Sequence, residues 1–175
     1  MGTDWMLLAV PKQDYDELKH MIDFRQEQRG EPPAPSAEAL RDTQLAVEAV
    51  KRKVLDEHKP WPLEALSRLA EGSTITTERF SRVMDLCAHT PGEFISTEGI
   101  AEETEMTVNE WRAACRKLGA HLRKHYPDVP TWEREPNAAQ PMWPLANVAG
   151  RNLQARDQLY VAITAEQAHR WSEVR

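Results

Sequence analysis

STEGIAEETEM at residues 96–106 and TVNEWRAACRKLGAHLRKHY at residues 107–126 are two helix patterns separated by a short break. Ser96 or Thr97 can cap the first helix, and Thr107 can cap the second, because Ser and Thr hydroxyls accept hydrogen bonds from the free N–H groups of a first turn. In the second segment apolar residues recur every three or four positions, at Val108, Trp111, Cys115, Leu118, Leu122 and Tyr126. This spacing is typical of one buried helix face. The stretch therefore predicts a helix-turn-helix.

The opposite face of the second helix is polar and basic. It carries Asn109, Arg112, Arg116, Lys117, Arg123 and Lys124. Residues 107–126 hold 5 basic and 1 acidic residue, a balance of +4, whereas the whole chain has a formal charge of −6. A helix that enters the major groove of double-stranded DNA needs such a face, because it neutralises phosphates while reaching base edges. An ordinary solvated face, enriched in cations near a helix C-terminus, is the alternative.

The elements around this stretch extend the pattern. We expect helices over residues 63–71 and from Thr76 or Thr77, and a brief strand at Phe94–Ile95. Strand-like segments at residues 142–148 and 158–164 form a predicted hairpin, and a last helix runs from residue 165 to about 174. The order predicts a mainly α winged helix-turn-helix with a small β-hairpin. Arg151 and Arg156 flank the hairpin tip, where a wing would contact DNA.

The amino-terminal third is organised differently. The apolar run of residues 5–10, closed by Pro11, predicts a strand, and a helix with a stripe of apolar residues follows it up to Gly30. Residues 31–36 contain three prolines, so no helix continues through them. A thin amphipathic helix follows to about residue 57. We therefore expect a strand-helix extension over 1–30, a linker and helix over 31–58, and a winged-helix domain over 59–175.

The predicted domain also resembles a known family. PGEFISTEGIA at residues 91–101, Trp111-Arg112, and LGAHLRK at residues 118–124 are similar to motifs of an uncharacterised actinobacterial winged-helix family. Members of that family also open with a strand ending in Val-Pro, as Val10-Pro11 does here. The resemblance covers about two-thirds of the chain, leaves residues 31–58 unexplained, and implies a winged-helix fold without any established activity.

Composition indicates a cytoplasmic protein without an enzymatic site. The chain of 175 residues has no signal peptide and no apolar run long enough to span a membrane. Cys87 and Cys115 fall on apolar helix faces and are expected in the core. No phosphate-binding loop or nucleophile motif occurs, and His121 and His125, four residues apart, lack further ligands at metal-site spacing. We expect neither catalysis, nor a metal, nor a cofactor.

Three functions remain open. The first is a DNA-binding transcriptional regulator that acts as a dimer through its amino-terminal elements. The second is a protein-interaction module that holds a protein partner on a winged-helix scaffold, and the third is an acidic anti-repressor or decoy. Four glutamates weigh against the first, because the helix that precedes the basic one normally lies across the phosphates. They are Glu98, Glu102, Glu103 and Glu105.

Overall fold

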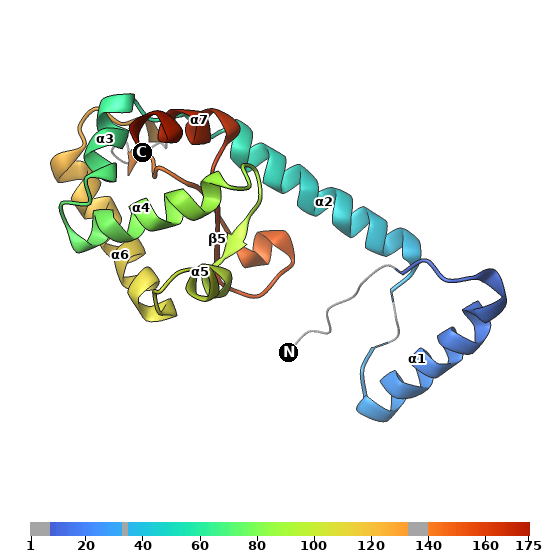
Figure 1. Cartoon of the computed structure of the whole chain (residues 1–175). Coiled ribbons are helices and arrows are strands. Elements are labelled where there is room, and N and C mark those ends of the chain that lie inside the picture. Colours follow the sequence, from blue (N-terminus) through green and yellow to red (C-terminus); the bar gives the residue numbers. More distant parts are fainter. Residues whose placement is uncertain (1–7, 33–34, 133–139) are drawn as a thin grey trace. The chain divides into compact units, whose positions relative to one another are not determined.

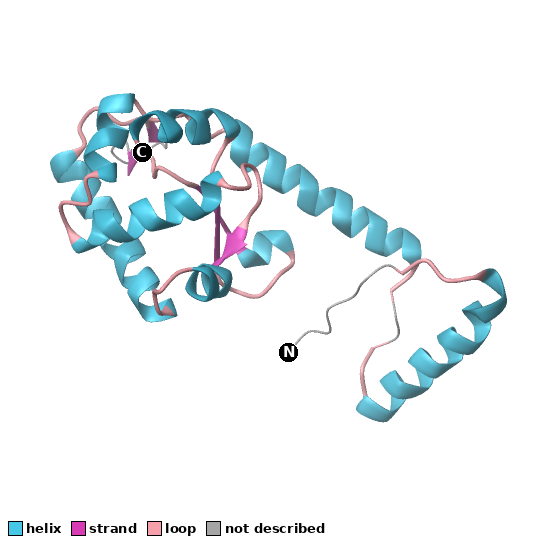
Figure 2. Ribbon diagram, in the orientation of Figure 1, coloured by secondary structure: helices cyan, strands magenta, loops and turns pink. Residues whose placement is uncertain are grey.

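The computed structural model describes residues 8–32, 35–132 and 140–175. The protein is mainly helical with a small antiparallel sheet, which confirms that part of the expected fold class (Figures 1 and 2). The chain divides into two compact units, Met1–Glu48 and Ala49–Arg175. None of the described helices combines the length and hydropathy that a membrane-spanning segment needs.

Two helices dominate the amino-terminal third. After a short 3₁₀ turn, Lys12–Asp14, helix α1 covers Tyr15–Arg29 and ends at Gly30, whose left-handed φ of 65° suits glycine, as expected. Helix α2 covers Ala37–Asp56. Its first turn is held by Ser36, whose Oγ accepts a hydrogen bond from the backbone N–H of Ala39 at 3.1 Å.

The expected amino-terminal strand is absent from the part of it that the structure describes. Residues 8–10 belong to no helix or strand, and residues 5–7 lie outside the described residues. Leu8 is 80% exposed instead of buried. A strand needs a neighbour to satisfy its backbone groups, and the described strands pair among themselves, so the apolar run alone was not sufficient evidence for one.

Among the described residues of the larger unit, five further α-helices occur: α3 (Leu63–Ala70), α4 (Ile75–Ala88), α5 (Thr97–Glu103), α6 (Val108–His125) and α7 (Ala165–Val174). Helix α3 packs on α4 and α7, while α4 packs on α6 and α7, and α5 on α6 (Figure 1). Helix α4 begins slightly earlier than expected. Thr74, not Thr76 or Thr77, is its cap, because Thr74 and Thr77 form a reciprocal capping box.

The three-stranded sheet joins segments far apart in the sequence. Strand β1 (Ile95–Ser96) pairs with β5 (Leu159–Ala162), and β5 pairs with β4 (Ala146–Ala149), all antiparallel, in the order β1-β5-β4. The predicted hairpin is therefore present but shorter than expected. Before β4, a separate two-stranded pair forms between β2 (Thr131–Trp132) and β3 (Gln140–Pro141). A 3₁₀ turn, Gly150–Leu153, connects β4 to β5.

The core of the larger unit lies between its helices. Trp61, Phe80, Trp111 and Trp171 are almost completely buried there, which confirms the buried helix face predicted at Trp111. Buried Gln167 connects two loops across the core, since its Oε1 accepts from the Trp61 backbone N–H at 2.8 Å and its Nε2 donates to the Pro144 carbonyl at 3.1 Å.

The two cysteines belong to this core. Cys87 is buried, and Cys115 is half-buried against the core. Burial raises the pKa of each thiol to about 12, so both stay protonated and poorly nucleophilic at neutral pH.

Candidate nucleic-acid interface

Helix α6 begins at a well-formed cap. The Thr107 Oγ1 accepts a hydrogen bond from the Glu110 backbone N–H at 3.2 Å, and the Thr107 backbone N–H donates to Glu110 Oε2 at 2.9 Å. This capping box satisfies two backbone donors that a helix start otherwise leaves open. The inner face then follows the predicted spacing, with Trp111, Leu118 and Leu122 buried. The local sequence thus determines which face of α6 points to solvent.

The outer face presents the predicted polar and basic residues. Asn109, Arg112, Arg116, Lys117, Arg123 and Lys124 are all exposed. At 3.6 residues per turn, Asn109, Arg112, Arg116 and Arg123 fall along one line of the helix, and Lys117 and Lys124 lie along its edge. We call these six residues the α6 strip. The structure therefore brings six of the eight candidate residues onto one continuous surface.

Most cations of the α6 strip have no anionic partner. Within the described part of the chain, Arg112, Arg116, Lys117 and Lys124 form no ion pair, and Arg123 makes one long hydrogen bond, to Gln140 Oε1 at 3.4 Å. Their positive charge is therefore available to an external anion.

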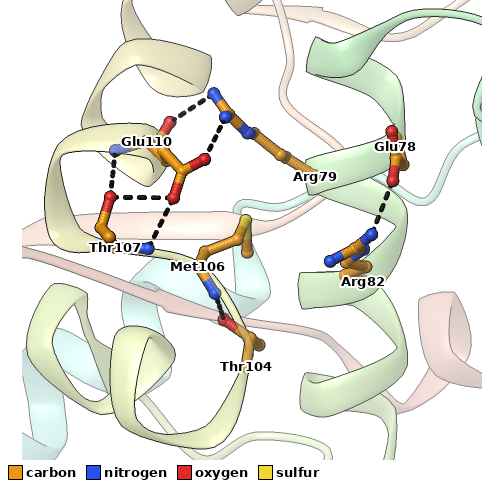
Figure 3. A network of polar contacts seen from close by, with 7 residues as sticks. All are labelled: Glu78, Arg79, Arg82, Thr104, Met106, Thr107 and Glu110. Atoms are coloured by element: carbon orange, nitrogen blue, oxygen red, sulfur yellow. Dashed lines mark hydrogen bonds and ion pairs between the residues drawn. The ribbon is translucent and has the colours of Figure 1, made fainter.

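Glu110, the one carboxylate of α6, is engaged elsewhere (Figure 3). Besides its cap, it accepts from Arg79 Nη2 of α4 at 2.7 Å, and Arg79 Nη1 donates to the Glu110 carbonyl at 3.2 Å. The hydrogen bonds from Thr107, and then the neighbouring Arg79, lower the pKa of the Glu110 carboxyl. The pair joins α4 to the start of α6, so Glu110 serves to anchor the helix.

The remaining two candidates lie in the β4–β5 connection, residues 150–158, and behave differently. Arg151 is exposed, with no ion pair among the described residues. Arg156 Nη1 instead donates to Glu98 Oε2 of α5 at 2.9 Å, and Gln158 Nε2 donates to the same oxygen at 3.3 Å. The charge of Arg156 is therefore partly neutralised, which reduces what this residue can offer to DNA at the predicted wing.

Tight backbone packing holds this connection together. Gly150 donates its backbone N–H to the Gln158 carbonyl at 2.8 Å, and its own carbonyl accepts from Ala155 at 2.9 Å. A Cβ at position 150 would lie 1.8 Å from the Arg156 carbonyl oxygen, so only glycine fits. The position of Arg156 beside Glu98 thus depends on the glycine at position 150.

The two histidines of α6 form a tilted ring contact. His121 and His125 have ring centroids 4.7 Å apart, and burial, with a smaller effect of His125, lowers the pKa of His121. Within residues 8–32, 35–132 and 140–175, no group of three or more metal-ligating side chains comes together.

Sequence reasoning missed two features of this interface. The Thr107-x-x-Glu110 spacing is a capping-box signal that could have identified the role of Glu110. The pairs Arg79–Glu110 and Arg156–Glu98 join residues far apart in the sequence, so they required the tertiary structure.

Comparison with known proteins yields no relative: no family model matches the chain, and no curated protein or solved structure is significantly similar to it.

Proposed function

We propose that this chain is a winged-helix protein that binds double-stranded DNA, a transcriptional regulator that acts as a dimer. Two features support the fold. The order α4, β1, α5, α6, β4, β5 is that of a winged helix, with α5 and α6 as the helix-turn-helix and residues 150–158 as the wing. The sheet order β1-β5-β4 also suits it, because it places the wing hairpin beside the strand that leads into α5.

The observation that carries the DNA proposal is the α6 strip. Its cations are exposed on the helix that such proteins insert into the major groove, while the single carboxylate of α6 is bound to Thr107 and Arg79. Small residues, Ala113, Gly119 and Ala120, separate the cations. Because these side chains are short, they leave room for a phosphate backbone to approach the helix. Asn109, in the first turn, is the residue that we expect to pair with adenine.

The glutamates of helix α5 would repel DNA phosphates, but one of them, Glu98, is paired within the protein. Glu98 faces Arg156 and Gln158, so one of the four glutamates is neutralised by the wing itself. The same pair occupies Arg156, so it leaves the net charge of α5 and the wing unchanged.

The test is the salt dependence of DNA binding. Fluorescence anisotropy with a labelled duplex should show affinity falling steeply as salt rises, with a log–log slope of about −0.9 per phosphate neutralised. Arg116→Ala should flatten that slope by about 1. Arg82→Ala is the matched control, because Arg82 lies on α4 paired with Glu78 at 2.6 Å, and it should leave the slope unchanged. Equal slopes for wild type and Arg116→Ala would refute the proposal.

A further inference from the structure

Among the described histidines, His58 alone is buried, and it lies just after the end of α2. It is 6% exposed and belongs to residues 57–62, which lead from α2 to α3 and which we call the α2–α3 connection. Its Nε2 lies 3.0 Å from the Trp143 carbonyl oxygen. A carbonyl oxygen only accepts hydrogen bonds, so Nε2 carries the proton and donates it. The site therefore holds the neutral imidazole, with a lone pair on Nδ1.

His58 is one of several contacts that join the α2–α3 connection to residues 142–144. The Lys59 backbone N–H donates to Met142 Sδ at 3.1 Å, and Trp61 Nε1 donates to the Met142 carbonyl at 3.1 Å. Met142 is 1% exposed, so this side of the contact belongs to the core. Of these donors, the imidazole of His58 is the one that takes up a second proton near neutral pH.

The buried site of His58 cannot accommodate that second proton well. Nδ1 is buried and has no hydrogen-bond partner among the described residues. An imidazolium there would bury both an unpaired N–H group and a positive charge, and each of these is costly away from water. In water both N–H groups of the imidazolium are hydrogen-bonded. A proton therefore binds more tightly when His58 has left its site.

We propose that His58 is a pH-sensitive switch whose protonation releases the α2–α3 connection from residues 142–144. A ligand that binds one of two states more tightly shifts the population toward that state, and here the ligand is a proton. The inference goes beyond DNA binding and does not depend on it.

Neighbouring charges do not offset the penalty for protonation. The charged side chains near His58 are exposed or paired with each other: Asp56, Glu57 and Lys59 beside it in the chain, and Glu166 with Arg170 on α7. Residues 142–145 contain no charged side chain. Burial lowers the pKa of His58 from 6.5, and the hydrogen bond to the Trp143 carbonyl offsets only part of that effect. The closed state therefore loses stability as the pH falls below 6.5, down to the folded pKa.

Hydrogen exchange of the full chain, followed by mass spectrometry, measures this opening. After correction for the intrinsic pH dependence of exchange, protection of the α2–α3 connection should fall by up to about tenfold from about pH 7.5 to about pH 5.5. His58→Gln keeps an N–H donor for the Trp143 carbonyl but does not titrate, so its protection should be equal at both pH values. His121→Gln is the matched control, because His121 is the other histidine whose pKa is lowered, and it should keep the wild-type fall.

A second measurement needs no variant. An NMR titration of the wild-type imidazoles should give His58 a midpoint below 6.5 and, above it, the neutral form protonated on Nε2.

Four results would each overturn the inference. They are wild-type protection that does not change with pH, a His58→Gln variant that loses protection as wild type does, a fall that disappears in His121→Gln, and a His58 midpoint at or above 6.5. None of these measurements involves DNA, so they succeed or fail independently of the proposed function.

Discussion

At the scale of single residues, Glu98 determines how much positive charge the wing presents. Its carboxylate holds both Arg156, at 2.9 Å, and Gln158. Both members of the ion pair are well exposed, so the pair itself adds little stability, but it occupies a guanidinium that DNA could otherwise use. Glu98 of α5 and a DNA phosphate would therefore compete for the same cation.

Replacing this carboxylate should strengthen DNA binding. We expect Glu98→Gln to release Arg156, tighten binding by a few-fold and steepen the log–log salt slope by up to about 1, as one more phosphate contact forms. Glu102→Gln removes the same charge from α5 without releasing Arg156, so its slope should match that of wild type. Anisotropy titrations at several salt concentrations measure both. Identical behaviour of the two variants would show that Arg156 does not contact DNA.

Replacing two glycines of the larger unit by alanine should change the free energy of unfolding in opposite directions. Gly150→Ala forces a Cβ against the Arg156 carbonyl at 1.8 Å and should destabilise the fold by about 2 kcal/mol. Gly119→Ala adds a methyl group on α6 whose nearest neighbour is Arg123 Nη1 at 3.8 Å, and it should stabilise the helix by about 0.5–1 kcal/mol. Urea denaturation of both variants tests this. A neutral Gly150→Ala would contradict the described packing of the wing.

At the scale of secondary-structure elements, an ion pair adds to the apolar contact between α4 and α6, in which the Phe80 and Trp111 rings lie 4.7 Å apart. Arg79 reaches both the side chain and the carbonyl of Glu110, in the first turn of α6 (Figure 3). The pair therefore fixes the start of the helix that carries the α6 strip.

The pKa of Glu110 gives this contact a pH dependence. Its pKa is lowered in the folded state from an ordinary value of 4.5, so the ionised form stabilises the fold above about pH 4.5, and this contribution is lost as the pH falls through the folded pKa. In Glu110→Gln the side-chain oxygen can still accept the hydrogen bond from the Thr107 backbone N–H, but the negative charge is lost. Its stability deficit, from urea denaturation, should be full at pH 7 and shrink below pH 4.5. A deficit that does not change with pH would contradict the ionic role of Glu110.

Local signals predicted most of the elements. Caps at Ser96, Thr107 and Thr164, each accepting a backbone N–H three residues later, begin α5, α6 and α7 where the sequence indicated. Strand lengths were less predictable. Pro144 lies within the expected strand 142–148, and Pro141 lies directly before it. Because proline cannot donate to a strand ladder, the β4–β5 ladder begins only at Ala146.

The partners of the site residues could not be predicted in this way. Helical spacing alone placed the α6 strip on one face, because that property belongs to a single helix. The Glu98–Arg156 and Arg79–Glu110 pairs depend on how α4, α5, α6 and the sheet pack together, which no local pattern encodes. The strand at residues 5–10 was wrong over residues 8–10 for a related reason, since an apolar run does not identify what it packs against.

At the scale of the whole molecule, charge is distributed unevenly. The chain has a formal charge of −6, yet residues 107–126 carry +4, and the structure exposes those cations on α6. A protein that coats nucleic acid nonspecifically would be basic throughout. If the protein binds DNA as we propose, a net negative body with one basic helix should favour binding through that helix, because acidic surfaces repel the phosphates.

We propose that the α6 strip is the surface that binds DNA, and the salt slope of the triple variant Arg112→Ala, Arg116→Ala, Arg123→Ala tests this. We expect this variant to retain the wild-type fold by circular dichroism, because all three side chains are exposed. Its log–log slope for duplex binding should be about 3 less steep than that of wild type, about 1 for each lost phosphate contact. A triple variant with the slope of wild type would contradict the account.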